Sequence, residues 1–276
     1  MSERTNEKFS NIVCWFLKNS DIGVIVALSG GVDSSVVALA AKKAFGNKAL
    51  AITANYKTLS EEEISSAIKV AKEINIKHKV IDYNELENLQ FVANDKLRCY
   101  YCRKELADCL LQESKKLGIN LIVDGTHVDD LSDTRPGIRA LRENGIRSPL
   151  QELGLHKTEV RSIAEFFGIS IYNKPSNSCL ASRIPQGTEI TYEKLRRVEM
   201  SEIVVKKIFN VEQVRVRDHG DVARVEVGSN ELAKLFDIQK LDLLDSELKE
   251  LGFRFVSIDA RGYRTGNLIL VKDRKL

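Results

Sequence analysis

The sequence predicts an α/β fold: a doubly wound parallel sheet, followed by a smaller C-terminal α+β domain. An apolar run of strand length, residues 24–28, ends in a Ser-Gly-Gly turn and continues as a helical pattern. Further apolar strands at 49–55 and 120–126 alternate with helical segments, which is typical of a parallel sheet covered on both faces. After Gly187 the pattern changes to helices combined with a hairpin. We therefore expect one domain at 1–187 and a second at 188–276.

The composition excludes several classes of protein. The 276 residues are 43% hydrophobic and 29% charged, with a formal net charge of +3, which is ordinary for a globular chain and implies no polyanionic partner. No apolar run approaches the roughly 20 residues of a transmembrane helix, and the polar N-terminus lacks the apolar core of a signal peptide. We therefore expect a cytoplasmic protein. Five cysteines, with a Cys-x-x-Cys pair among them, indicate metal or redox chemistry in such a chain instead of disulfides.

The first elements of the chain have clear local signals. Residues 8–19 predict an amphipathic helix, with Cys14 beside its apolar face and expected to pack in the core. A helix at 61–74 is predicted by Ser60 as its N-cap and by three glutamates in its first turn. A short strand at 78–82 follows it.

The middle of the chain predicts two more helices around a long polar connection. The first helix runs from the Cys99–Cys102 pair to Leu117, where Gly118 serves as a C-cap. The segment 127–147 is charged throughout, and so long a connection in a compact domain favours a functional role. The second helix covers about 157–168.

The second domain is predicted to contain two helices and three strands. Its expected elements, in order, are a helix at 191–208, strands at 211–216 and 222–227 joined by a turn at 218–221, a helix at 230–251 and a strand at 254–259.

The turn Ser29–Ser35, with the sequence Ser-Gly-Gly-Val-Asp-Ser-Ser, is expected to bind phosphate. Its two glycines have no Cβ, so the backbone can turn sharply and approach a ligand. Free N–H groups and the positive end of the following helix dipole face the turn. The lysine of a Walker A loop is absent. The serine hydroxyls are suited to binding pyrophosphate, and the Asp33 carboxylate is suited to binding Mg²⁺. The alternative interpretation is a tight turn whose Asp33 or Ser34 only caps the following helix.

This stretch resembles the PP-loop motif of the ATP pyrophosphatases, which cleave ATP to AMP and pyrophosphate and adenylate an oxygen of their substrate. Further motifs narrow the resemblance to the LarE family, the ATP-dependent sulfur transferases of nickel-pincer nucleotide synthesis. These motifs, which span nearly the whole chain, are Asp124-Gly125-Thr126, Asp133-Thr134-Arg135-Pro136-Gly137, Pro149-Leu150, Lys157-Thr158-Glu159-Val160-Arg161, Cys179-Leu180-Ala181-Ser182-Arg183, Gly187-Thr188 and Arg215-Val216-Arg217 with His219, Asp221, Arg224 and Glu226.

The resemblance implies adenylation of a carboxylate of a pyridinium-3,5-dicarboxylic acid mononucleotide and its replacement by a thiocarboxylate. Cys179 occupies the position of the family's sulfur-bearing cysteine, and Arg183 is expected to favour its thiolate, the nucleophilic form. In the sacrificial version of the reaction, this cysteine becomes dehydroalanine. Asp33 is expected to be catalytic. Binding of ATP is expected from Ser29, Gly30, Gly31, Asp33, Ser34, Ser35, Thr53 and Gly125.

The sequence departs from the sacrificial pattern because it also contains Cys99 and Cys102. Three thiolates can hold three irons of a [4Fe–4S] cluster and leave one iron open, as is thought for a three-cysteine branch of LarE. With Cys179 as the third ligand, sulfide or another donor would supply the sulfur. A structural zinc site is the first alternative, although zinc usually takes a fourth protein ligand. Cysteines that bind nothing are the second. Cys109 lies two helical turns, about 10 Å, from Cys102 and is expected to pack in the core.

Arg215 and Arg217 alternate on a predicted strand and therefore share a face. The resemblance implies that they bind the phosphate of the substrate, and the alternative is a ladder of surface charges. Glu202, Glu226 and Asp129 or Asp130 are secondary candidates for metal or substrate contacts. The four histidines show no ligand spacing, so no role is expected for them.

Three rival functions remain open at this point. A tRNA thiolase would share the ATP and cluster chemistry but would need a broad basic surface. An ammonia-using PP-loop synthetase would need no set of three thiolates, and a nucleotide-binding regulatory protein would release no pyrophosphate. The resemblance favours a small-molecule nucleotide substrate and a homo-oligomer, without membrane or nucleic-acid partners.

Overall fold

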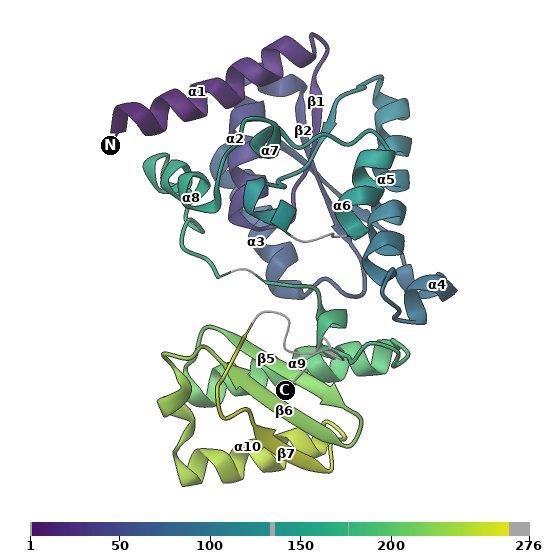
Figure 1. The fold of residues 1–276 in the computed structure, drawn as a ribbon, viewed down its shortest axis with the longest axis vertical. Helices are drawn as coiled ribbons and strands as arrows, with labels where there is room; N and C mark the ends of the chain where they lie inside the picture. The colour runs from purple at the N-terminus through teal and green to yellow at the C-terminus, as the bar shows by residue number, and fades with distance from the viewer. Residues whose placement is uncertain (1, 133–135, 176, 265–276) are drawn as a thin grey trace. The chain divides into compact units, whose positions relative to one another are not determined.

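The computed structural model describes residues 2–132, 136–175 and 177–264, which form two compact units. The first unit comprises Met1–Phe91 and Leu97–Asn177, and the second comprises Val92–Lys96 and Ser178–Leu276 (Figure 1). The division after Asn177 comes before the boundary expected at Gly187.

The short segment Val92–Lys96 belongs to the second unit, to which hydrogen bonds attach it. Gly187 N donates to Asn94 O at 2.9 Å, Ile190 N donates to Val92 O at 3.0 Å, and the Asn94 side chain donates to Pro185 O and Thr188 O. These partners lie about 90 residues apart in sequence, so no local pattern indicates this attachment.

The first unit contains a four-stranded parallel sheet, which confirms the predicted fold class. Its order is β3-β2-β1-β4, with β1 (Val24–Ala27) between β2 (Ala49–Asn55) and β4 (Ile122–Val123), and β3 (Lys77–Asp82) at the other edge. The strand predicted at 120–126 is therefore short. Its edge is continued by Arg147, which forms a parallel bridge with Val123.

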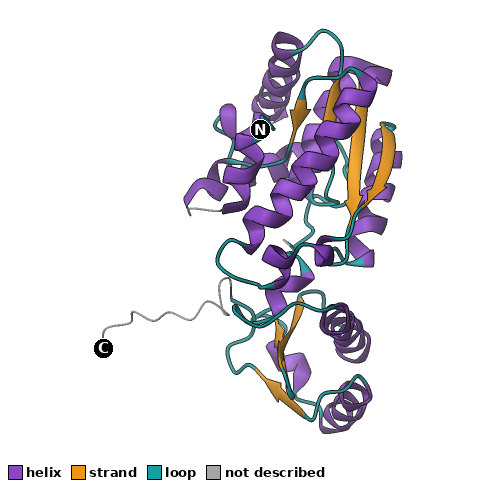
Figure 2. Ribbon diagram, turned by 90° about the vertical axis from the view of Figure 1, so that its right-hand side faces the viewer, coloured by secondary structure: helices purple, strands orange, loops and turns teal. Residues whose placement is uncertain are grey.

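Helices cover both faces of this sheet, as Figures 1 and 2 show. Alternate residues of β1 belong to different cores: Val24 and Val26 pack with the helices of one face, and Ile25 packs with those of the other. The first face carries α1 (Ser2–Asn19), α2 (Val32–Phe45), α3 (Glu61–Ile74) and α8 (Lys157–Phe166). The second face carries α5 (Arg98–Leu117) and α6 (Pro136–Glu143). The shorter pieces are η1 (Gly46–Lys48), η2 (Glu85–Glu87), α4 (Leu89–Val92), η3 (Val128–Ser132) and α7 (Pro149–Glu152).

The expectation that Cys14 packs in the core is wrong, because Cys14 is exposed. The buried face of α1 is formed by Phe9, Ile12, Phe16 and Trp15, whose indole donates to Glu152 at 3.0 Å. At about 100° per residue, position 14 lies on the opposite side of the helix from position 12.

The second unit is an α+β structure with its own core. Its sheet has the order β5-β6-β7, where β5 (Val214–His219) and β6 (Val222–Val227) form the hairpin and β7 (Phe255–Ile258) pairs in parallel with β6. Helices α9 (Tyr192–Phe209) and α10 (Ile238–Glu250) pack on this sheet.

Two predicted boundaries in this unit shift. The first strand of the hairpin begins at Val214 instead of 211 and continues through Asp218 and His219, so the turn narrows to Gly220 and Asp221. The helix expected at 230–251 is divided into η5 (Leu232–Leu235) and α10, and Asp237 caps α10. None of the helices described in either unit is both long enough and apolar enough to cross a membrane.

The pairing of β2 with β3 makes stability sensitive to the protonation of His78. The Thr53 hydroxyl donates to Leu28 O at 2.7 Å, so the His78 Nε2–H donates to Thr53 Oγ1 at 2.8 Å, and burial lowers the His78 pKa below 6.5. The unfolded chain therefore binds this proton more readily, and stability falls as the pH drops from about 6.5 towards the folded pKa. Urea midpoints should decline more steeply on acidification in the wild type than in His78→Gln. Equal slopes would contradict this.

Candidate active site

The turn after β1 holds its shape through its serine hydroxyls. Ser34 Oγ and Ser35 Oγ donate to Gly31 O at 3.1 and 2.8 Å, and Ser29 N donates to Ser34 Oγ at 3.2 Å. Gly31 precedes α2 in an extended conformation. The turn thus leads directly into the positive end of α2, where the first N–H groups of the helix have no intrahelical partner. This is the geometry of a phosphate-binding turn.

Two glycines allow neighbouring segments to approach this turn. Gly30 has a φ of +77°, and a Cβ at this position would lie 2.4 Å from Glu63 O at the start of α3. At Gly125, beyond the end of β4, a Cβ would lie 2.5 Å from Ser34 N. Only glycine fits either position, because the obstructing atoms belong to backbone.

The Asp124–Thr126 segment around Gly125 is held by a network of short hydrogen bonds. Asp124 accepts from Ser148 Oγ at 2.6 Å and from Thr126 Oγ1 at 2.6 Å and N at 3.1 Å. Thr53, also expected at the nucleotide site, is buried. Its hydroxyl donates to Leu28 O and accepts from His78 Nε2. Its predicted role in binding ATP stays a prediction.

Two lysines from distant parts of the chain reach the turn. Lys157 Nζ lies 2.5 Å from Asp33 Oδ2, and Lys174 Nζ lies 3.2 Å from Gly30 O and 2.9 Å from Glu63 Oε1. They bring positive charge to a turn that lacks the Walker lysine. Lys157 belongs to a motif that carries the family resemblance, which was the available signal for it, whereas Lys174 was not expected.

Asp33 retains one oxygen suited to a metal ion. Asp33 Oδ1 is buried and accepts no hydrogen bond from the described residues. A buried carboxylate oxygen without a hydrogen bond, next to the turn before α2, is a fitting ligand for Mg²⁺, which prefers carboxylate and phosphate oxygens.

Two histidines lie in this site, although no spacing in the sequence predicts a role for them. The buried His127 places Nε2 3.9 Å from Asp33 Oδ1 and 3.5 Å from Asp130 Oδ2. Asp129 accepts from Lys157 N and from His156 Nδ1, both at 2.7 Å, and these bonds lower the pKa of Asp129. The same hydrogen bond raises the pKa of His156. Asp129 thus anchors the backbone at the start of α8, from which Lys157 reaches Asp33.

Cys99 and Cys102 lie in the first turn of α5. A spacing of three residues places both on one face of the helix. Cys99 is exposed and Cys102 is half-buried. Gly137 of α6 lets the two helices approach, because a Cβ there would lie 3.2 Å from Cys99 O. The neighbouring motif residues 133–135 lie outside the described part of the chain.

Among the residues that the structure describes, no group of three or more His, Cys, Asp or Glu side chains is arranged to hold a metal ion. Cys99 and Cys102 belong to the first unit and Cys179 to the second. Cys109 is half-buried, and burial raises the pKa of its thiol, in keeping with a packing role.

Cys179 precedes the short helix η4 (Leu180–Arg183) in the second unit and is half-buried. Its carbonyl accepts from Ser182 N at 2.9 Å. The Arg183 side chain is fully buried and forms a two-point ion pair with Glu202, at 2.7 and 2.9 Å. Both carboxylate oxygens of Glu202, a secondary candidate for metal or substrate contact, thus accept hydrogen bonds from Arg183.

The alternative of a surface ladder for Arg215 and Arg217 is wrong, because both are buried. Arg217 pairs with Glu226 at 2.8 and 3.0 Å, and Arg224 pairs with the other oxygen of Glu226 at 3.0 Å. Arg215 donates to Val214 O at 2.6 Å and lies over the Tyr263 ring at 5.1 Å.

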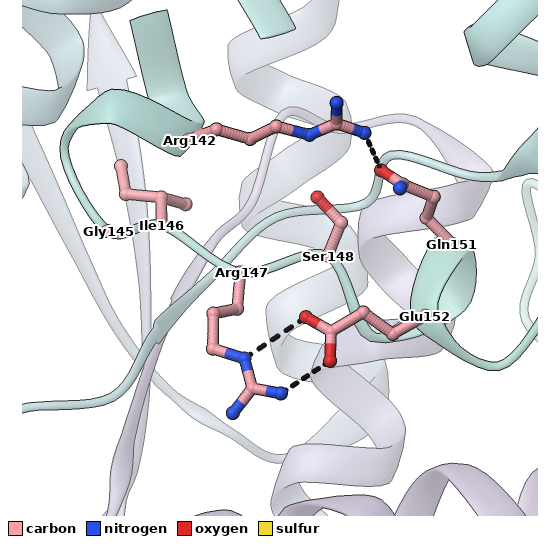
Figure 3. A pocket seen from close by; sticks show the side chains of 7 residues that line it. All are labelled: Arg142, Gly145, Ile146, Arg147, Ser148, Gln151 and Glu152. Carbon is pink, nitrogen blue, oxygen red and sulfur yellow. Dashed lines mark hydrogen bonds and ion pairs between the residues drawn. The ribbon is translucent and has the colours of Figure 1, made fainter. Parts of the chain in front are cut away.

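A surface cavity of about 450 Å³ lies beside Arg147, where that residue continues the sheet edge (Figure 3). Arg142 donates to Gln151 across it at 2.7 Å, and Arg147 pairs with Glu152. None of the predicted site residues lines it.

Comparison with known proteins agrees with this geometry. A family model described as NAD synthase matches residues 11–98. The chain is 32% identical, over 89% of its length and 88% of the relative, to pyridinium-3,5-bisthiocarboxylic acid mononucleotide synthase of Lactiplantibacillus plantarum. It is 41% identical to the uncharacterized protein slr1717 of Synechocystis sp., covering 88% of this chain and 91% of the relative. It is 29% identical to GMP synthase of Aeropyrum pernix, covering 68% of this chain and 40% of the relative.

The parallel sheet, the glycine-bearing turn before α2 and the matched family model define a PP-loop ATP pyrophosphatase, an enzyme that depends on ATP. Within that class, the chain belongs to the LarE family, and it is a LarE-like sulfur transferase.

Lys157 is expected to contribute directly to ATP binding. Replacing it in Lys157→Met should raise the Kd for Mg·ATP, measured by calorimetry, about 10- to 100-fold, the effect of losing one hydrogen bond to a charged group. Lys8→Met is the matched control, because Lys8 pairs with Glu159 on the same helix, α8, and makes no contact with Asp33. An unchanged Kd in Lys157→Met would refute this role.

Proposed function

We propose that this enzyme adenylates the carboxylates of pyridinium-3,5-biscarboxylic acid mononucleotide and replaces them with thiocarboxylates for the nickel-pincer nucleotide cofactor. The observation that carries the proposal is the 32% identity, over 89% of the chain, to a protein named for the bisthiocarboxylic acid product. The phosphate-binding turn, with Asp33 and Lys157 beside it, supports the ATP-dependent half of the reaction.

In the activation half, an oxygen of the substrate carboxylate attacks the α-phosphorus of ATP. The bond to the β-phosphate breaks, and pyrophosphate leaves with the electron pair. Ser29, Gly30, Gly31, Ser34 and Ser35 would hold the pyrophosphate through N–H groups and hydroxyls. Asp33 would hold Mg²⁺ through Oδ1, and Lys157 would shift from Asp33 towards the phosphates. Preorganised positive charge of this kind stabilises the leaving group as its charge develops.

In the sulfur half, we propose Cys99, Cys102 and Cys179 as the ligands of a [4Fe–4S] cluster. The shared helical face of Cys99 and Cys102 supports two of these ligands, and thiolates are the usual donors to such clusters. Cys99, Cys102 and Cys179 would hold three irons and leave one iron without a protein ligand, and the cluster would supply sulfide for the acyl-adenylate, from which AMP leaves. Sulfide or another donor would then renew the sulfur, and Cys179 would not be consumed.

The alternative is sacrificial transfer from Cys179. Its thiolate attacks the acyl carbon and AMP leaves, which forms a thioester to the protein. Loss of the Cys179 α-proton then breaks the Cβ–S bond and releases the thiocarboxylate, leaving dehydroalanine in the chain.

Arg215 and Arg217 are proposed to bind the phosphate of the substrate. Arg217 uses two nitrogens on Glu226 and a third on Ser182 O, and Arg215 donates to Val214 O. Burial and the neighbouring Arg183 cation lower the pKa of Arg215, so a phosphate beside Arg215 would relieve an electrostatic cost.

Iron analysis tests the cluster. Anaerobically reconstituted protein should contain about four irons and four sulfides per chain, and serine at any of Cys99, Cys102 or Cys179 should abolish this content. Cys109→Ser is the matched control and should retain it. Colourless, iron-free protein after reconstitution would defeat the cluster proposal.

Intact mass after turnover separates the two sulfur routes. A protein that is not consumed should keep its mass over several turnovers. Loss of about 34 Da, located at Cys179 by peptide mapping, would instead establish the sacrificial route, because elimination removes the elements of H₂S. Release of pyrophosphate without any thiocarboxylate product would contradict both.

A further inference from the structure

One arginine, Arg183, donates several hydrogen bonds to the turn that carries Cys179. Arg183 Nη1 donates to Ser178 O, to Cys179 O at 3.0 Å and to Ser182 Oγ at 3.2 Å. The two peptide groups that follow Ser178 and Cys179 thus have their carbonyls on the same guanidinium. Because the side chain has no exposed surface, water cannot replace these bonds without opening the turn.

The other side of the guanidinium is anchored in the fold. Its Nε and Nη2 form the two-point pair with Glu202 of α9, and Glu202 Oε1 also accepts from Val216 N of β5 at 3.0 Å. The carboxylate therefore ties the arginine to both a helix and a strand. A planar guanidinium can contact a carboxylate along one edge and carbonyls along another, which a lysine cannot do.

A second buried arginine holds the far end of the same turn. Arg217 Nη1 donates to Ser182 O at 2.9 Å, and Glu226 fixes its remaining nitrogens. Leu180, Ala181 and Ile184 are buried around the turn, while Cys179 stays half-buried. The backbone is thus fixed on both sides of the half-buried Cys179 side chain.

We propose that Arg183, held by Glu202, is the positioning residue of Cys179: it fixes the backbone that presents the sulfur atom for transfer. The inference rests on the proposed function, because it takes Cys179 as the residue that bears sulfur. It holds for both sulfur routes, since a nucleophile and a cluster ligand each require a fixed Sγ. A misplacement of about 1 Å at a reacting atom can cost about 100-fold in rate.

Arg183→Lys tests the proposal, with three measurements on the full-length protein. Amide hydrogen exchange of residues 179–184 should become about tenfold faster, the effect of losing one hydrogen bond to a charged group. The rate constant for thiocarboxylate formation, kcat on the cluster route or the single-turnover rate on the sacrificial route, should fall about 100-fold without a comparable rise in the pyridinium substrate concentration needed for half-maximal rate. Pyrophosphate release should stay within about twofold of the wild type, because the residues proposed to act on ATP belong to the first unit and Arg183 is not proposed to bind the substrate.

Arg197→Lys is the matched control. Arg197 is also on α9 and pairs with the buried Asp218 at 2.6 Å, but it makes no contact with the turn. This variant should lower the thermal midpoint without changing any of the three measurements. Should Arg183→Lys fail to fold, Glu202→Gln weakens the same anchor while it keeps the size of the side chain and one acceptor oxygen, and the rate of thiocarboxylate formation should fall about tenfold.

Normal sulfur transfer in Arg183→Lys would overturn the proposal, as would parallel loss of pyrophosphate release and sulfur transfer, or the same loss of rate in Arg197→Lys. Failure of the proposed function is distinguishable, because the wild type itself would then form no thiocarboxylate. Hydrogen exchange would still decide whether Arg183 holds the turn.

Discussion

The close approach of backbone to backbone at the turn before α2 is the constraint on which the rest of the first unit depends. Gly30 brings α3 against the turn, and Gly125 brings the segment after β4 against Ser34. Any side chain at either position would meet main-chain atoms that cannot move aside. The sheet, the helix N-terminus and the Asp124–Thr126 segment therefore form one rigid frame, and the phosphate site is preorganised before a ligand arrives.

Charge at this frame is supplied from elsewhere in the chain. A P-loop carries its lysine within the loop, whereas here Lys157 and Lys174 come from segments more than 120 residues further on. Asp129 and the carbonyl of Gly30 give these lysines fixed surroundings. In the proposed function, this arrangement would separate the binding of phosphate by backbone from its neutralisation by side chains. Asn177, which also belongs to the first unit, donates to Glu63 of α3 at 3.0 Å.

The second unit uses buried ion pairs where an apolar core would have sufficed for stability. Glu202 and Glu226 each hold arginines that are nearly or fully buried. Such pairs recover little more than their desolvation cost, and breaking one of them is strongly destabilising. These pairs orient the guanidinium: when a carboxylate binds one edge of it, the N–H groups of the other edge point at particular backbone carbonyls. In this unit, those carbonyls belong to the turn of Cys179 and Ser182.

The sequence alone determined the fold class, because apolar strands of period and length suited to a buried sheet leave few alternatives, and both β2 and α3 begin and end where local patterns predict. It also predicted the turn before α2 as a phosphate site, since two glycines before a helix are a local signal for that chemistry. Tertiary structure alone decided the rest: which face of α1 is buried, that Val92–Lys96 joins the second unit, that His127 and two lysines meet Asp33, and that Arg183 turns inward. The reason is physical. Each of these depends on a hydrogen bond or contact between residues far apart in sequence, and no local pattern encodes such a partner.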